Sequence, residues 1–340
     1  MFTEGKIGKL KTKNRFIRSA TAEFGANSDG TITPLYFELY RQLSLNEIGV
    51  IIQGHLYISE EGKAHDKMAG ISQNSHLKQL KQLTKIVHDS GNLAIIIAQL
   101  NHGGIHSVSK KAPSILDGKK AVEMTNDDIE SVIIDFKSAA KRAKKVGYDG
   151  IQIHAAHGYL LGQFLSKRTN KREDTWGGIL ENRASFLLDI YRGIRDSIGV
   201  NFPILVKMNG SDDPIDGFPI EEGTRVAKWL AEEGVDTLEV SGMKSTRIIE
   251  DEELTYFVPF AEKIKKQVGD MPVSVVGGFR YFTTMQRIRD NFADFISISR
   301  PFIREPDLIL KFKDGKKKVD CISCNKCFNV EDIVKCRSDK

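Results

Sequence analysis

Two histidines and a tyrosine stand together in the stretch Ile153–Ser166, which reads IHAAHGYLLGQFLS. His154 and His157 are three residues apart at the end of an apolar run, and Tyr159 follows two residues later. Two imidazoles at this spacing could bind one metal ion, donate hydrogen bonds to a ligand, or end a buried strand. No carboxylate or thiol close by completes a metal-ligand set. The residues alone therefore leave ligand binding and packing at a strand end as the stronger alternatives.

The composition bounds where such chemistry can take place. The chain has 340 residues, of which 40% are hydrophobic, and a net charge of +5. This length suits one large α/β barrel or two ordinary domains. The longest apolar runs are too short to span a bilayer, and the first fifteen residues lack the apolar centre of a signal peptide. We therefore expect a cytoplasmic protein without a membrane partner, and the composition leaves a homo-oligomer open.

One basic run, Lys311–Lys318, stands out near the end of the chain. Apart from Phe312, this run contains no aromatic residues of the kind that stack on nucleic-acid bases. Its lysines are typical of a solvated surface segment. We therefore expect no nucleic-acid partner.

Eight short, nearly continuous apolar runs alternate with helical patterns. Runs of this kind are typical of parallel strands that are buried on both faces. Eight β-then-α units predict a TIM (β/α)₈ barrel over residues 1–311, followed by a basic, four-cysteine tail over 312–340. A doubly wound sheet is less well supported, because no G-x-G-x-x-G follows the first strand. The expected strands are Phe16–Thr21, Gly49–Gly54, Ala94–Leu100, Gly150–His154, Ile204–Met208, Thr237–Ser241, Val273–Gly277 and Phe295–Ser299.

Polar residues and glycines follow these strands at the end where barrel enzymes place their active sites. Gly277–Gly278 after the seventh strand and Arg300 after the eighth predict a phosphate site, because glycines expose backbone N–H groups and Arg300 adds charge. Gln99 and Lys207 would then face the other end of a phosphorylated cofactor. A glutamine offers both a donor and an acceptor, which suits the pyrimidine edge of a flavin. For Lys207, a Schiff base with a substrate and a simple ion pair are the alternative roles.

The motif around His154 resembles the signature of the old yellow enzyme family of FMN oxidoreductases. The resemblance is strongest to the branch that contains 2,4-dienoyl-CoA reductases and bacterial ene-reductases. Six separate segments match in order, so the similarity extends over most of the chain. They are Lys13–Thr21, Ile51–Ala64, Ala98–Gly104, Ile153–Phe186, Val275–Arg280 and Ile298–Leu308.

The resemblance implies an FMN cofactor and NAD(P)H as co-substrate. The residues that it assigns to FMN are Ser19, Ala20, Thr21, Gln99 and Lys207, with Gly277, Gly278, Ser299 and Arg300 around the phosphate.

The resemblance also implies a reaction. His154 and His157 would hydrogen-bond the carbonyl oxygen of a small unsaturated carbonyl substrate or enoyl thioester, and Tyr159 would donate a proton. NAD(P)H and this substrate would share one site in ping-pong order, so that the activated C=C bond is reduced. Oxidation of a C–N bond on the same scaffold and a non-catalytic flavin or iron–sulfur redox protein are the alternatives.

All four cysteines lie within the last twenty residues, at Cys321, Cys324, Cys327 and Cys336. A C-x-x-C-x-x-C spacing with a fourth cysteine nearby is typical of soft-metal sites. The segment resembles the one that holds a [4Fe–4S] cluster in the dienoyl-CoA reductase branch, with one residue fewer between the second and third cysteines. The sequence therefore leaves a [4Fe–4S] cluster, a zinc site and free thiols as alternatives.

Overall fold

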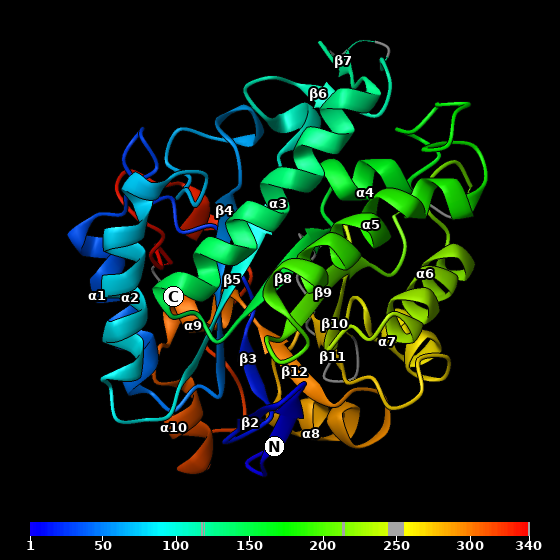
Figure 1. Ribbon diagram of the computed structural model, residues 1–340. Coiled ribbons are helices and arrows are strands. Elements are labelled where there is room, and N and C mark those ends of the chain that lie inside the picture. The colour runs from blue at the N-terminus through cyan, green and yellow to red at the C-terminus, as the bar shows by residue number, and fades with distance from the viewer. Residues whose placement is uncertain (117, 119, 213–214, 244–254, 339–340) are drawn as a thin grey trace.

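Eight parallel strands close into a barrel in the computed structural model, within the part of the chain that it describes (all residues except 117, 119, 213–214, 244–254 and 339–340; Figure 1). Neighbouring strands follow the order β10-β11-β12-β3-β4-β5-β8-β9, so the first and last barrel strands pair and the sheet has no edge. The predicted TIM barrel is confirmed. Its strands are β3 (Phe16–Arg18), β4 (Val50–Tyr57), β5 (Ile95–Asn101), β8 (Gly150–Ala155), β9 (Ile204–Asn209), β10 (Thr237–Ser241), β11 (Val273–Val276) and β12 (Phe295–Ile298).

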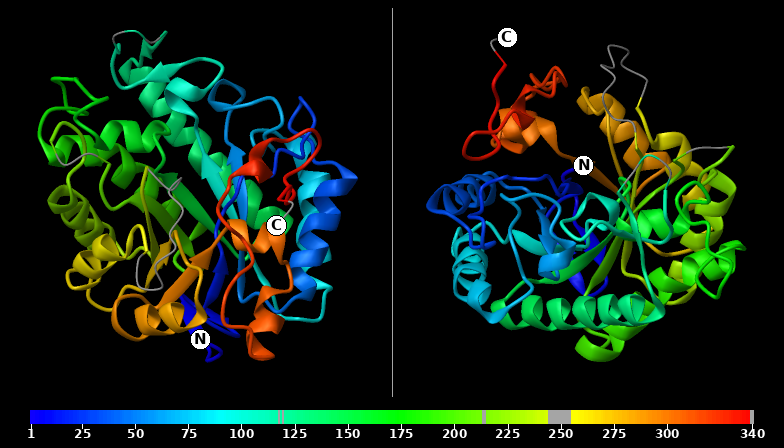
Figure 2. Two further views of the ribbon diagram at one scale, coloured as in Figure 1. Left: turned by 180° about the vertical axis from the view of Figure 1, so that it is seen from behind. Right: turned by 90° about the horizontal axis from the view of Figure 1, so that it is seen from above.

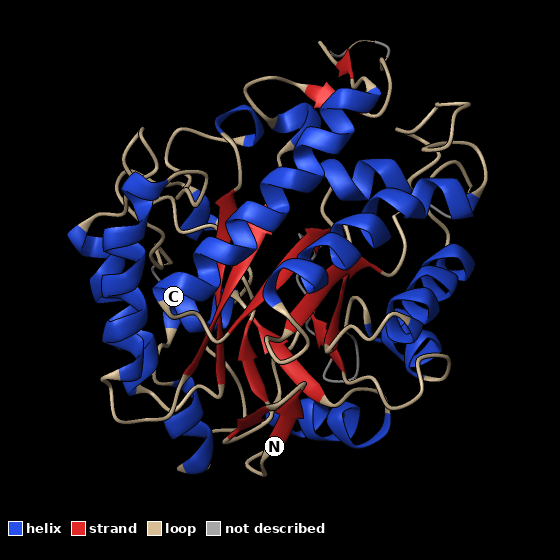
Figure 3. Ribbon diagram, viewed as in Figure 1, coloured by secondary structure: helices blue, strands red, loops and turns tan. Residues whose placement is uncertain are grey.

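Helices surround this barrel, as Figure 3 shows by secondary structure. The long helix after Thr125 begins with a capping box, in which Thr125 and Asp128 satisfy each other's backbone N–H groups, and ends at Gly147 with φ 94°. The helices are α1 (Pro34–Leu45), α2 (Leu77–His88), α3 (Asn126–Val146), α4 (Leu160–Leu165), α5 (Leu180–Ile198), α6 (Ile220–Glu232), α7 (Val258–Lys265), α8 (Phe282–Asn291), α9 (Arg300–Arg304) and α10 (Leu308–Lys313). Among the described residues, no helix combines the length and the apolar character needed to cross a membrane.

An antiparallel hairpin of β1 (Gly5–Ile7) and β2 (Leu10–Thr12) lies at the N-terminal end of the barrel, near the N label in Figure 1. Its Ile7 is fully buried and packs with the inward-facing apolar side chains of the strands, among them Ile17, Val50 and Phe295. These residues fill the lower half of the barrel. The opposite, C-terminal end is therefore the one left for polar chemistry.

Two strands differ from their predicted bounds in ways that shape this C-terminal end. β3 stops at Arg18, and the chain then turns so that the Thr21 hydroxyl donates to the Ser19 carbonyl oxygen at 3.0 Å. β4 runs on to Tyr57 and contains a bulge, because Gly54 and His55 together face the single residue Gln99 of β5. Both irregularities release residues from regular pairing just where the strands reach the top of the barrel.

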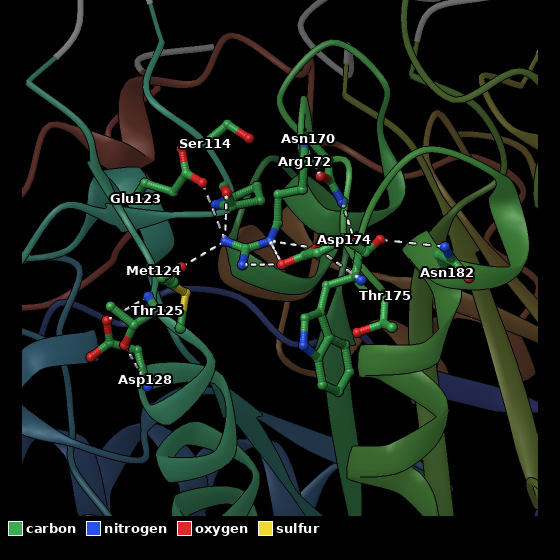
Figure 4. Close-up of polar contacts among 12 residues, drawn as sticks. Ser114, Glu123, Met124, Thr125, Asp128, Asn170, Arg172, Asp174, Thr175 and Asn182 are labelled. Carbon is green, nitrogen blue, oxygen red and sulfur yellow. Dashed lines mark hydrogen bonds and ion pairs between the residues drawn. The ribbon is translucent and has the colours of Figure 1, made fainter.

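The second half of the sequence motif that begins at Ile153 is a structural clamp (Figure 4). Arg172, in the loop after α4, pairs with Asp174 at 2.5 Å and donates to the carbonyl oxygens of Met124 (2.6 Å) and Pro113 (3.2 Å). These contacts tie the loop to the short β6 (Lys111–Ala112) and β7 (Val122–Glu123) ladder above the barrel. The motif therefore fixes one wall of the barrel mouth as well as supplying polar groups.

The C-terminal tail lies against the side of the barrel near α1, and appears in red in Figure 2. Its Val334 N–H donates to the Glu23 carbonyl oxygen at 2.7 Å, and the Lys67 ammonium donates to the carbonyl oxygen of Glu331. α10 spans the boundary expected at residue 311, so the division into a barrel and a tail stays a prediction. The short 3₁₀ turns are η1 (Glu60–Gly62), η2 (Asn74–His76), η3 (Gly104–His106) and, in the tail, η4 (Lys326–Phe328).

Candidate active site

A pocket of about 310 Å³ opens at the C-terminal ends of the barrel strands. Every residue that the sequence analysis assigned to FMN or to catalysis lines it, although these residues come from strands far apart in the chain. They are Ser19, Ala20, Thr21, Gln99, His154, His157, Tyr159, Lys207, Gly277, Gly278, Ser299 and Arg300.

The floor of this pocket is a continuous chain of buried hydrogen bonds. Lys207 donates to the Ser19 hydroxyl at 2.8 Å, and Ser19 donates to Glu239 at 2.5 Å. From the other side, Gln99 donates to Gln152 at 2.7 Å, and Gln152 donates to the second carboxylate oxygen of Glu239 at 2.8 Å. Glu239 also pairs with the Lys207 ammonium at 3.5 Å. One carboxylate therefore holds in place both side chains expected to face a flavin ring.

Gln152 and Glu239 were missed in the sequence analysis. Both lie inside segments that read as apolar strands, GIQIH and TLEVS. A charged residue in a strand buried on both faces needs a partner, and that requirement was the available signal. Which partner it meets depends on barrel closure, because Glu239 and Lys207 come from neighbouring strands and Ser19 from across the barrel.

The three residues of the opening motif meet above this floor. The rings of His154 and Tyr159 lie 5.1 Å apart, and those of His154 and His157 lie 5.0 Å apart at right angles. The Ala156 N–H donates to His154 Nδ1 at 3.3 Å, so the neutral ring carries its proton on Nε2. His154 therefore offers a hydrogen-bond donor.

The backbone at His157 is in the left-handed region, with φ 58°. The His157 backbone N–H donates to the Asn209 side-chain oxygen at 3.2 Å. The His157 ring nitrogen Nε2 lies 2.7 Å from the Ser241 hydroxyl. Left-handed backbone at a residue other than glycine costs about 1 kcal/mol or more and persists only where the surroundings enforce it. The strand end is thus built to hold this imidazole in one position.

Burial keeps the histidines of the site neutral and the tyrosine protonated. Burial, with Lys207 and His55 as smaller causes, lowers the pKa of His157 to about 3, and burial lowers that of His154 well below its ordinary value. Burial also raises the pKa of Tyr159. At neutral pH the pocket therefore presents neutral imidazoles and an intact phenol O–H.

These depressed pKa values predict that the protein loses stability as the pH falls below about 6.5. Burial lowers the pKa of His55 and His157 to about 3 and that of His102 to about 4. Below pH 6.5 these histidines bind protons in the unfolded chain but not in the folded protein. Each of them therefore lowers the free energy of unfolding by up to about 1.4 kcal/mol for each pH unit of acidification. Urea denaturation at pH 7.5, 6 and 5 measures this slope.

The variant His102→Asn measures the contribution of a single histidine to this pH dependence. His102 accepts the Gly104 N–H through Nδ1 at 3.1 Å, a bond that an asparagine can replace. His102→Asn should reduce the slope between pH 6 and 5 by about 1 kcal/mol per pH unit. An unchanged slope would contradict the neutral, buried state of this imidazole.

The opposite end of the pocket has the features expected of a phosphate site. Gly277 and Gly278 have φ values of 109° and 79°, and a Cβ on Gly277 would lie 2.9 Å from the Phe257 ring. The hydroxyls of Thr21 and Ser299 lie 2.7 Å apart, which joins the ends of β3 and β12. Glycine is therefore required where the backbone turns along the wall of the pocket.

Arg300 is held by the tail, which the sequence analysis did not predict. Its Nη1 donates to the Asn325 side-chain oxygen at 2.6 Å and reaches the Ser323 carbonyl oxygen at 3.5 Å. Both acceptors are neutral oxygens, so these two contacts orient the guanidinium without cancelling its charge. Ser323, Asn325 and Phe328 also line the pocket, so the tail forms part of its wall.

The structure does not support a metal site, which was one of the alternatives left open for this tail. Among the residues that it describes, which include Cys321, Cys324, Cys327 and Cys336, no three His, Cys, Asp or Glu side chains gather closely enough to hold a metal ion. Burial raises the pKa of Cys327 to about 11, so without a metal this side chain is a thiol at neutral pH. A [4Fe–4S] cluster or zinc ion is therefore not carried into the function considered below.

His55 is a second residue of the site that the sequence analysis missed. It lies in the β4 bulge, is 7% exposed and lines the pocket beside Tyr159. A histidine between the apolar residues of IIQGHLY was the available signal.

Comparison with known proteins decides the family. The family model described as "NADH:flavin oxidoreductase / NADH oxidase family" matches residues 1–318. The chain belongs to this NADH:flavin oxidoreductase family. It is 34% identical to an NADPH dehydrogenase of Listeria welshimeri over 90% of this chain and 92% of that one. It is 33% identical to the NADH oxidase of Thermoanaerobacter brockii over 96% of this chain, and it spans about half (52%) of that relative's length.

Solved structures, among them one of an old yellow enzyme homologue, share the fold. An old yellow enzyme homologue from Zymomonas mobilis matches with a TM-score of 0.82 and 28% identity over 95% of both chains. A 2-naphthoyl-CoA reductase matches with a TM-score of 0.86 and 26% identity, over 93% of this chain and 52% of that one. These matches identify this chain as an NAD(P)H:flavin oxidoreductase of the old yellow enzyme type, which uses FMN.

The residues of the pocket fit an FMN molecule. A cation and an amide stand on its floor at Lys207 and Gln99, and a glycine turn with Arg300 stands at its other end. This arrangement matches a ligand with a polar heterocycle at one end and a phosphate at the other.

Proposed function

We propose that this oxidoreductase uses NAD(P)H to reduce the activated C=C bond of an α,β-unsaturated carbonyl compound or enoyl thioester. NAD(P)H and the unsaturated substrate would occupy the one pocket in turn, in ping-pong order. The observation that carries this proposal is the neutral His154 ring with its proton on Nε2, next to a half-buried, protonated Tyr159. Such a pair suits an acceptor oxygen that gains negative charge as the reaction proceeds.

Each residue has a role that its surroundings support. His154 and His157 would donate hydrogen bonds to the carbonyl oxygen, which draws electron density from the double bond. Tyr159 would protonate the carbon next to that carbonyl, because a phenol keeps its proton at neutral pH and this one is further stabilised by burial. Because the imidazoles are fixed and neutral, they orient the substrate without competing for that proton.

The nine residues expected to hold FMN divide between its two ends. Ser19, Ala20, Thr21, Gln99 and Lys207 would contact the ring system, whereas Gly277, Gly278, Ser299 and Arg300 would contact the phosphate. Bound FMN would supply hydride transfer between NAD(P)H and the substrate. The chain's own contribution is to position the ring over its floor and to hold the phosphate with backbone N–H groups and the guanidinium.

The contact between Arg300 and the tail predicts an effect on cofactor affinity. Asn325→Ala removes the side-chain oxygen that orients the Arg300 guanidinium. We expect the dissociation constant for FMN to rise about ten-fold, because a charge-assisted hydrogen bond loses its fixed geometry. Quenching of flavin fluorescence on titration of the apoprotein measures this constant.

Riboflavin, which lacks the phosphate, is the matched ligand for this measurement. The Asn325→Ala variant should bind riboflavin as the unsubstituted protein does, and Asn329→Ala, at an exposed tail position outside the pocket, should leave FMN binding unchanged. An equal loss of FMN and riboflavin affinity would show that Asn325 supports the pocket wall rather than the phosphate end.

Anaerobic stopped-flow absorbance of the FMN-loaded protein tests the proposed reaction. NADH or NADPH should bleach the flavin band, and 2-cyclohexenone or an enoyl thioester should then restore it. Restoration by an imine in place of an enone, with none by the enone, would favour the reaction that oxidises C–N bonds. Absence of bleaching by either nucleotide would favour a non-catalytic flavin protein.

A further inference from the structure

His55 reaches the pocket through an irregularity in β4. Gln53 pairs with Ala98 and Leu56 with Leu100, so two residues of β4, Gly54 and His55, oppose one residue of β5. A bulge of this kind changes the direction in which a strand presents its side chains. The imidazole consequently lines the pocket from within a strand whose residues are all buried.

The bulge is held in place by a buried ion pair. The Gly54 N–H donates to the Glu23 carboxylate at 3.0 Å, and Arg18 pairs with the same carboxylate at 2.9 Å. A Cβ on Gly54 would lie 2.0 Å from a Glu23 oxygen, so the close approach requires glycine. The contacts between Gly54 and Glu23 therefore give His55 a defined position.

The hydrogen bonding of His55 leaves one polar atom for a ligand. The Asn101 amide nitrogen lies 3.0 Å from His55 Nδ1, so with the amide donating, the neutral ring carries its proton on Nε2. His55 Nε2 is buried and has no hydrogen-bond partner in the structure. Burial, followed by His65 and Lys207, lowers the pKa of His55 to about 3, so the ring stays neutral. A buried N–H without an acceptor is costly, and an acceptor on a ligand would satisfy it.

Three rings define where that acceptor would lie. The His55 ring is 5.2 Å from Tyr159 and 6.2 Å from His154, and Tyr159 is 5.1 Å from His154. The proposed proton donor is therefore flanked by two imidazoles, each with Nδ1 occupied and its proton on Nε2. A carbonyl oxygen has two lone pairs, which His154 and His157 would use.

We propose that His55 binds a second oxygen of the substrate, so that the preferred substrates are unsaturated dicarbonyl compounds with an acceptor on each side of the C=C bond. This assignment rests on the proposed function and specifies its substrate class. His55 acts as a specificity-determining residue, because a monocarbonyl substrate leaves its N–H without an acceptor.

The test compares ligands with one and two carbonyl groups in the FMN-loaded protein. kcat/KM is measured for N-methylmaleimide and for 2-cyclohexenone. Dissociation constants are measured for the saturated analogues, N-methylsuccinimide and cyclohexanone, from the change in flavin absorbance. The variants are His55→Leu, which removes the N–H, and His55→Gln, which keeps a donor. His65→Leu is the control, because its ring lies 5.7 Å from His55 but does not line the pocket.

His55→Leu should lower kcat/KM for the maleimide and weaken succinimide binding, each by about ten-fold, with changes below about two-fold for the monocarbonyl ligands. His55→Gln should recover part of that loss, and His65→Leu should lose neither. Equal losses for both ligand classes, no loss, or a Gln variant as impaired as the Leu variant would overturn the assignment. If the unsubstituted protein reduced no enone, the proposed function would fail, whereas the binding constants would still decide the role of His55.

Discussion

The Tyr159→Phe variant is expected to reduce 2-cyclohexenone about 10²- to 10⁴-fold more slowly than the unsubstituted protein, the usual contribution of one positioned acid. Flavin reduction by NAD(P)H should change less than about two-fold, because that half-reaction needs no proton from the phenol. The variant removes a single hydroxyl and leaves the ring between His55 and His154. Separate stopped-flow measurements of the two half-reactions provide the comparison.

The control for this variant is Tyr281→Phe. Tyr281 lies outside the pocket, with its ring under the Lys318 ammonium at 4.8 Å. It should leave both half-reactions unchanged. A Tyr159→Phe variant in which both half-reactions fell by the same factor would mean that the tyrosine shapes the pocket and does not donate the proton.

The second large effect concerns stability. Lys207→Met should lower the free energy of unfolding of the apoprotein by about 3–5 kcal/mol, because it leaves the buried Glu239 carboxylate without its cation. Ser19 and Gln152 would still donate to that carboxylate, but neither carries a charge. Equilibrium urea denaturation, followed by far-UV circular dichroism, measures the loss.

The double variant Lys207→Met, Glu239→Gln separates charge from packing. Glutamine removes the charge and keeps one acceptor oxygen, which can accept from Gln152 while the glutamine amide group donates to the Ser19 hydroxyl oxygen. The double variant should therefore recover about 2 kcal/mol or more relative to Lys207→Met. A double variant no more stable than Lys207→Met would show that the lysine contributes through packing of its stem.

The barrel could be predicted from the sequence because strands buried on both faces are continuous apolar runs. Each of the eight runs overlaps a barrel strand, and some, such as Ile204–Met208 and Thr237–Ser241, lie wholly within one. The pocket residues followed from position, because His154 and Lys207 stand where strands end. The strand ends were less predictable: β3 stops at Arg18 so that Ser19 can join the polar floor, an interaction with residues far along the chain.

Residues whose role depends on a partner from another strand could not be predicted. Nothing near Glu239 in the sequence points to Lys207 or Gln152, and nothing near Asn325 points to Arg300. His55 depends on a bulge, which is set by the long-range contact between Gly54 and Glu23. The cysteine spacing favoured a metal site from local pattern alone, whereas the folded tail does not gather a set of ligands among the described residues.

The pairing of β3 with β12 has a consequence for biosynthesis. The site expected to hold the phosphate joins residues that follow the first and the last barrel strand in the sequence, where Thr21 contacts Ser299. A ribosome must therefore release almost the whole barrel before the two halves of this site can meet. Contacts of such long sequence separation also form late, because loop closure must precede them. We therefore expect the cofactor to be loaded only after β12 has left the ribosome, and chains that stop before β12 should be colourless.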